Sequence, residues 1–134
     1  MRLWICAAAV NGFLAVALGA LAAHGLRGAV GPERLAWIET GSDYGLAHGL
    51  ALIGVALLWA RAPAPPRSLR LAGWGFLAGT LLFSGALYLM GMTGWRALGL
   101  VVPVGGILLL GGWAALFAYG WGLRGRSGAM GARL

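Results

Sequence analysis

Four long runs without a formally charged residue dominate this 134-residue sequence and constrain its fold more than any other feature. With the first counted only as far as His24, the runs cover residues 3–23, 44–60, 71–95 and 97–123. A membrane-spanning helix needs about 20 mostly apolar residues, and inside lipid the backbone must satisfy its own hydrogen bonds. We therefore predict a single all-α domain, an integral membrane four-helix bundle. Its helices are expected at about 3–23, 43–60, 71–93 and 97–122.

Composition favours lipid over water as the solvent of this chain. Hydrophobic residues make up 60% of it, its mean hydropathy is +0.85, and only 10% of its residues are charged, whereas about a quarter are charged in an ordinary soluble domain. The net charge of +7 comes from arginines that flank the apolar runs and form no single basic stripe. Nucleic acid is therefore not expected as a partner, and the lipid bilayer is.

The first run has two interpretations. Its sequence, MRLWICAAAVNGFLAVALGALAA, begins with a basic residue, continues with an apolar core and ends with small residues, as a secretory signal peptide does. We favour a retained transmembrane helix, because the apolar stretch is long for a signal peptide and Asn11 lies within it.

Arginines are distributed unequally between the two sides of the predicted bundle. The side with the N-terminus, the middle loop and the C-terminal tail carries seven of the ten, and the other side carries three, together with all three acidic residues. Because basic residues are enriched in cytoplasmic loops, both termini of this multi-pass protein are expected in the cytoplasm. The tail, from about 124 to 134, is expected to be disordered.

The stretch GPERLAWIETG, between the first two runs, is typical of a short helix that lies on the membrane surface. Pro32 suits the first helical turn and Gly41 suits a helix C-cap, so a separate interfacial helix at about 32–41 is one expectation. The other is a single helix that continues through Gly41 into the second span. The sequence favours neither.

Glycines spaced by four residues mark the start of the second span, TGSDYGLAHG. On a continuous helix, Tyr44 and His48 fall with these glycines within an arc of about 140°, whereas Asp43 points the opposite way. Small residues at this spacing let another helix approach closely. We therefore expect Tyr44 and His48 to face the bundle interior, next to the helix-packing residues Gly45 and Gly49.

The predicted topology brings most polar and irregular features to the outer half of the membrane. His24 ends the first run on that side, and Tyr88 lies in the outer part of the third, with Ser84 one turn deeper. Pro103 precedes two glycines, which predicts either a kink or a helix start there. The candidate polar cluster consists of His24, Tyr44, His48, Ser84 and Tyr88, and the expected packing or kink residues are Gly45, Gly49, Pro103, Gly105 and Gly106.

Several of these motifs resemble one family of small membrane proteins. They are GALAAHGL (19–26), the Trp37/Thr40/Tyr44/His48 pattern followed by GLALIG, LFSGALYL (82–89) and PVGGILLLGGW (103–113). In this order, over about residues 3–120, they are similar to the family called domain of unknown function 423, whose animal relative is transmembrane protein 256. The resemblance implies a four-helix protein of the bacterial plasma membrane and no established activity. The chain has Ala86 in place of the family's usual serine and VPVGG in place of its common TPIGG, which removes hydroxyl groups.

Two functional interpretations follow. Ionisable residues inside membranes often mark functional sites, so a transporter or sensor could bind a small molecule or a proton at His48, Tyr44, His24 and Tyr88. Alternatively, these side chains hydrogen-bond across helices, and the protein has a non-enzymatic accessory, assembly or structural role in a larger membrane complex or as a homo-oligomer. We favour the second interpretation.

No catalytic or metal-binding residues are predicted. A hydrolase triad would require an inward-facing carboxylate to accompany Ser84 and a histidine, and a zinc site would require clustered cysteine or carboxylate ligands. Two histidines at helix ends are weak evidence for haem bound by His24 and His48, so no cofactor is predicted.

Overall fold

The computed structural model describes residues 1–131 and consists of four long helices. They are α1 (Arg2–Ala20), α2 (Pro32–Arg61), α3 (Arg67–Thr93) and α4 (Val102–Gly131). A short π-helical turn, η1 (Leu21–Gly25), extends α1, and a 3-10 turn, η2 (Arg96–Leu100), precedes α4. Each of the four spans is long and apolar enough to cross a membrane, which confirms the predicted fold class.

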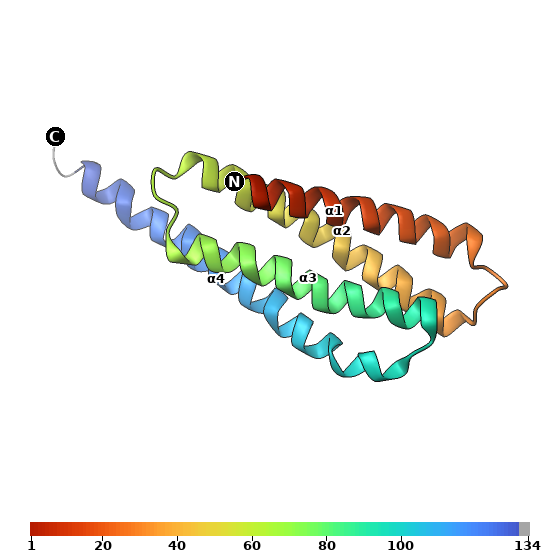
Figure 1. Ribbon diagram of the computed structural model, residues 1–134. Helices are drawn as coiled ribbons and strands as arrows, with labels where there is room; N and C mark the ends of the chain where they lie inside the picture. Colours follow the sequence, from red (N-terminus) through yellow and green to blue (C-terminus); the bar gives the residue numbers. More distant parts are fainter. Residues whose placement is uncertain (132–134) are drawn as a thin grey trace.

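Successive helices run in opposite directions along the bundle (Figure 1). The two ends of the chain therefore lie at one end of the bundle, together with the α2–α3 loop. The α1–α2 and α3–α4 loops lie at the opposite end, which we call the far end. This arrangement is the one that four crossings of a membrane require.

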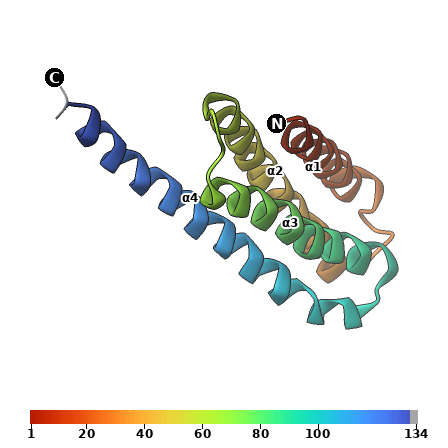
Figure 2. The same ribbon diagram turned by 60° about the vertical axis from the view of Figure 1, so that its left-hand side comes forward.

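The bundle is open rather than closed. α1 packs against α2, α2 against α3 and α3 against α4, but among the described residues the backbone of α4 approaches neither α1 nor α2. Figure 2 shows α4 lying along α3 and diverging from the other helices toward its C-terminus. As a result, α2 and α4 lie on either side of α3 without packing closely against each other.

Glycines allow neighbouring helices in this row to approach closely. A Cβ atom on Gly49 of α2 would lie 3.4 Å from a carbonyl oxygen of α1, and one on Gly45 would lie 2.9 Å from the hydroxyl oxygen of Tyr88. Between α3 and α4, a Cβ atom on Gly75 would lie 2.8 Å from the Cα atom of Gly112. The helices are therefore held at a separation that side chains at these positions would prevent.

At the far end, Arg34 of α2 binds the end of α3. Its Nε atom donates a hydrogen bond of 2.8 Å to the carbonyl oxygen of Gly91, and its Nη2 atom donates one to the carbonyl oxygen of Met92. Carbonyls in the last turn of a helix have no N–H partner within the helix. Gly94 then ends α3 in the left-handed conformation, with a φ of 77°. One side chain thus satisfies two otherwise unpaired carbonyls and joins α2 to α3.

α2 is one continuous helix, so the segment 32–41 is its first part and not a separate interfacial helix. Of the two alternatives that the sequence left open, the structure has the continuous one. Gly41 lies inside the helix, where a Cβ atom would be 2.9 Å from the ring of Tyr88. This glycine therefore makes room for an aromatic ring of α3 and does not end a helix.

α4 begins at Val102, after η2, and this places Pro103 in its first turn. The missing N–H of proline has no helical carbonyl partner in that position, so the result is a helix start and not a kink. At its other end, α4 continues to Gly131, although the composition of the tail predicted disorder from about residue 124. No proline interrupts this stretch. Residues 132–134 lie outside the described part of the chain.

Candidate functional site

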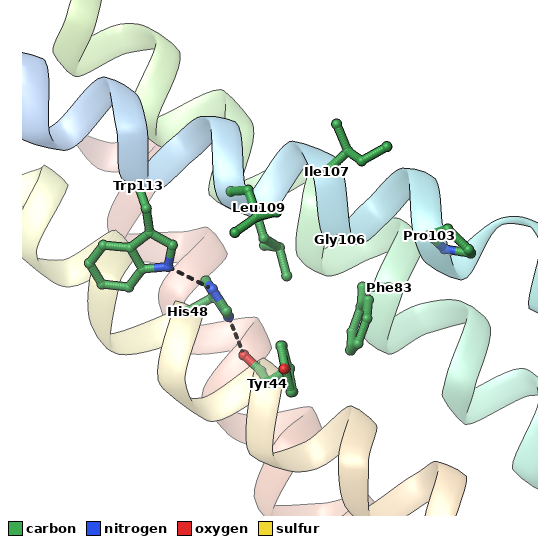
Figure 3. Close-up of a pocket in the computed structure, with 9 residues that line it drawn as sticks. Tyr44, His48, Phe83, Pro103, Gly106, Ile107, Leu109 and Trp113 are labelled. Carbon is green, nitrogen blue, oxygen red and sulfur yellow. Dashed lines mark hydrogen bonds between the residues drawn. The ribbon is translucent and has the colours of Figure 1, made fainter.

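A groove between α2 and α4 has the dimensions and lining of a ligand site. Its volume is ≈ 420 Å³. Tyr44 and His48 line it from α2, Phe83 lines it from α3, and a row of α4 residues from Pro103 to Trp113 forms the opposite wall (Figure 3). Tyr44 and Trp113 are 44% and 48% exposed, so the groove opens sideways toward the surrounding lipid. We call it the α2–α4 groove.

His48 is the most buried of the titratable side chains in this groove, at 6% exposed. The Nε1 atom of Trp113 donates a hydrogen bond of 3.1 Å to its Nε2 atom, and its Nδ1 atom lies 2.8 Å from the carbonyl oxygen of Tyr44 (Figure 3). An indole nitrogen can only donate and a carbonyl can only accept. His48 is therefore the neutral tautomer with its proton on Nδ1, and neither ring nitrogen is free for a ligand.

The contact between His48 and Trp113 bridges two helices whose backbones do not meet. Both rings also pack on Phe76 of α3, with centroids 5.7 Å and 5.0 Å from it. Aromatic pairs at such distances stabilise a structure beyond the area they bury. The three rings therefore hold α4 against α2 at one end of the groove and leave the rest of it open.

We expect Trp113→Phe to loosen α4 without abolishing the fold. The phenyl ring keeps an aromatic contact with Phe76 but cannot donate to His48, and a hydrogen bond between helices in a membrane contributes about 0.6–2 kcal/mol. The free energy of unfolding in mixed micelles should fall by about that amount, and nitrogen NMR should show a changed environment at Nε2 of His48. Trp95→Phe, at an exposed far-end tryptophan, is the control. Equal losses in the two variants would contradict the bridge.

Tyr44 lies at the rim of the groove and not in the bundle interior, where the spacing of the glycines predicted it. Its ring centroid is 4.5 Å from that of Phe83 and 5.8 Å from that of His48, on which it stacks with an interplanar angle of 21°. Its hydroxyl group has no hydrogen-bond partner among the described residues. Tyr44 therefore presents an unused donor at the mouth of the groove.

Tyr88 and Ser84 of α3 contact a different part of the α2 surface and do not line the groove. The hydroxyl group of Tyr88 donates a hydrogen bond of 3.0 Å to the carbonyl oxygen of Gly41. Ser84 is 1% exposed, and its hydroxyl oxygen would lie 3.7 Å from a Cβ atom on Gly45. The hydroxyl group of Ser84 has no hydrogen-bond partner among the described residues. This second polar group belongs to the contact of α3 with the glycines of α2.

The five residues that the sequence placed in one cluster therefore occupy three places. Tyr44 and His48 face α4, Ser84 and Tyr88 face the glycines of α2, and His24 is exposed in η1 at the far end. The width of the predicted arc explains the division. An arc of about 140° on one helix is wide enough for its two edges to face different neighbours. The edge with Tyr44 and His48 faces α4, and the edge with Gly49 faces α1.

Sequence reasoning missed Trp113 as the partner of His48. A signal was present, because Trp113 closes the motif PVGGILLLGGW and an indole N–H in an apolar environment usually finds an acceptor. The sequence could not supply the position of α4 relative to α2. That position depends on how both helices pack on α3.

The groove offers binding chemistry, with aromatic rings and one unpaired hydroxyl group. The described residues contain no group of three or more His, Cys, Asp or Glu side chains that could hold a metal ion. Both nitrogens of His48 bind protein groups, and His24 lies at the far end, so the two histidines do not form an axial pair for haem. Asp43 lines a different, smaller pocket beside α1.

Comparison with known proteins identifies the family. Residues 18–106, more than half of the chain, match the family described as protein of unknown function (DUF423). The chain belongs to the DUF423 family. This confirms the resemblance of its motifs and agrees with the membrane architecture described above. The family match includes the whole of α2 and α3 and ends within the first turns of α4.

Relatives of this DUF423 protein are named as membrane proteins. It is 40% identical over 121 residues to the UPF0382 inner membrane protein YgdD of Escherichia coli (strain K12), with 86% of each chain covered. It is 36% identical over 116 residues to the UPF0382 membrane protein SAB0533 of Staphylococcus aureus, with 87% of this chain and 93% of the relative covered. It is 40% identical over 113 residues to the UPF0382 membrane protein YwdK of Bacillus subtilis. No solved structure matches it.

Proposed function

We propose that this DUF423 protein is a non-enzymatic membrane protein with an accessory, assembly or structural role. The observation that carries the proposal is the use of its intramembrane polar side chains. His48 binds Trp113 and a backbone carbonyl, and Tyr88 binds the carbonyl oxygen of Gly41, so these groups position helices. A catalytic base must reach a substrate proton, and both nitrogens of His48 already bind protein groups.

We place the protein in the bacterial plasma membrane with both termini in the cytoplasm. The name of the Escherichia coli relative supports the inner membrane. Both termini lie at the same end of the bundle, on the side to which the sequence assigns seven arginines, and basic residues favour the cytoplasm. Trp4 of α1 packs over Gly73 of α3, where a Cβ atom would be 2.7 Å from its ring, which supports a retained first helix.

The open arrangement of the helices supports association with another membrane protein or a second copy. Among the described elements, the backbone of α4 comes close only to α3 and η2, and Trp113 reaches α2 through its side chain. Its large apolar side chains Leu110 and Phe117 are 71% and 70% exposed. This surface contacts lipid unless another transmembrane helix covers it.

Purification in a mild detergent, followed by mass spectrometry of proteins and small molecules, tests this proposal. We expect the tagged protein to elute with a specific larger membrane complex or as a homo-oligomer. A monomer without a protein partner would contradict the accessory role.

A second candidate function, a sensor or transporter for a small molecule, is favoured by a specific observation. The α2–α4 groove is open to lipid and carries the unpaired hydroxyl group of Tyr44. This candidate keeps Tyr44 and His48 as site residues and does not include His24 or Tyr88. A small molecule retained by the purified protein would support it.

A further inference from the structure

We propose that the α2–α4 groove binds the flat ring of an uncharged, lipid-soluble carbonyl compound of the quinone type, with Tyr44 as its hydrogen-bond donor. The inference rests on the second candidate function, the small-molecule site, and names the ligand class of that site. It does not depend on the accessory role.

The opening of the groove determines where its ligand comes from. Ile107 and Leu110 on the α4 wall are 67% and 71% exposed, and they face the space beside the bundle and not a water-filled interior. None of the residues that line the groove carries a formal charge. A ligand that enters here must dissolve in the hydrocarbon and must itself be uncharged, because an unpaired charge in this environment is costly.

The depth of Tyr44 fits a ligand with a polar head and an apolar tail. Tyr44 directly follows Asp43, and the next charged residue along α2 is Arg61. The 17 residues between those two charges span roughly 26 Å of helix, close to the roughly 30 Å thickness of the hydrocarbon core. Tyr44 therefore lies just inside one boundary of that core, and His48 lies about one turn deeper. Lipid-soluble molecules keep a polar head near such a boundary and their tails below it.

The lining of the groove fits a flat ring with a hydrogen-bond acceptor. The rings of Tyr44, Phe83 and Trp113 provide aromatic faces and edges against which a planar head can pack. Both nitrogens of His48 are occupied, so the unpaired donor in the groove is the hydroxyl group of Tyr44. The ligand must therefore supply the acceptor, as a carbonyl oxygen does. The volume of ≈ 420 Å³ lies within the range of about 300–1,000 Å³ that is usual for ligand sites.

Equilibrium binding to the purified full-length protein in lipid nanodiscs tests the inference, with decyl-substituted benzoquinone as the probe. Decylbenzene, which has the same tail and ring size but no carbonyl group, is the comparison ligand. We expect the quinone to bind at least about tenfold more tightly than decylbenzene, and Tyr44→Phe to weaken quinone binding about two- to tenfold without affecting decylbenzene. Because Tyr44 lies at the rim, this variant is expected to fold normally.

A second pair of variants locates the site. Ile107→Trp places a larger side chain in the groove and should reduce quinone binding at least tenfold. Ile53→Trp makes the same change at an exposed position of α2 outside the groove and should leave binding unchanged.

Three results would overturn the inference. Equal affinities for quinone and decylbenzene would make the groove a site for an acyl chain only, and no effect of Tyr44→Phe would show that Tyr44 is not the donor. Equal effects of the two tryptophan variants would place the bound quinone elsewhere on the protein. None of these results bears on copurification with a membrane complex, so the accessory role stands or falls separately.

Discussion

Replacing Gly105 with leucine is expected to separate α3 from α4 and to produce the largest loss of stability of any substitution considered. A Cβ atom at this position would lie 2.5 Å from the backbone nitrogen of Phe83 and 2.9 Å from its Cα atom. Backbone atoms in the middle of a helix cannot rotate away as a side chain can. Overpacking costs about 1–3 kcal/mol where neighbours can adjust, and more where they cannot, so we expect a loss of at least about 3 kcal/mol.

The free energy of unfolding in mixed detergent micelles measures this effect, and Gly120→Leu is the matched control. Apart from its chain neighbours and the backbone of its own helix, a Cβ atom on Gly120 would meet no atom of the described side chains or of another helix within 4 Å. Leucine has a better helix propensity than glycine by up to about 1 kcal/mol, so the control should be neutral or slightly stabilising. Similar losses for Gly105→Leu and Gly120→Leu would show that α3 and α4 do not meet at Gly105.

Replacing Arg34 with leucine is expected to have the second largest effect. The guanidinium group binds the carbonyl oxygens of Gly91 and Met92 at the end of α3. Hydrogen bonds to charged groups contribute about 1.5–3 kcal/mol, so we expect a loss of about 2–3 kcal/mol in the free energy of unfolding. Hydrogen exchange should become faster in the last turn of α3 but not at its centre. Arg34→Lys should lie between the wild type and Arg34→Leu, because an ammonium group cannot form the same fork.

Glu33→Gln is the control for the Arg34 variants. It removes the salt bridge between Glu33 and Arg96, whose side chains are 55% and 73% exposed. Exposed ion pairs contribute about 0–1 kcal/mol, so the change in stability should be small. If Glu33→Gln destabilised the protein as much as Arg34→Leu does, the far end would be held by its surface charges and not by the contact of Arg34 with α3.

The sequence predicts the four spans well because charge and hydropathy alone locate them. Charged residues are excluded from the hydrocarbon, so each run between charged residues locates one of the four spans. The helix bounds follow less closely, because α2 begins at Pro32, well before its run, and α4 continues past its run to Gly131. Close approach through Gly45 and Gly49 was also expected from their spacing, and the structure places both at helix contacts. These expectations depend on one helix at a time.

Expectations that depend on two or more helices were less successful. Whether α2 continues through Gly41 is decided by the ring of Tyr88, which lies 47 residues later in the sequence and packs on that glycine. The division of the predicted polar cluster depends on which neighbouring helix each edge of α2 faces. The hydrogen bond between His48 and Trp113 depends on the position of α4 along α3. Helical periodicity gives the direction of a side chain but not the neighbour it meets.

We propose four membrane crossings that put the far end of the bundle outside the cytoplasm. Labelling with a membrane-impermeant maleimide in intact bacterial cells tests this most directly. The background variant is Cys6→Ala, which removes the exposed native cysteine. Each test variant then carries a single cysteine in place of Ala29, Ala64 or Ala97, all of which are exposed in loops or turns. We predict labelling at 29 and 97 in intact cells, and at 64 only after the cells are permeabilised. Labelling at 64 in intact cells, or protection at either 29 or 97, would contradict the account.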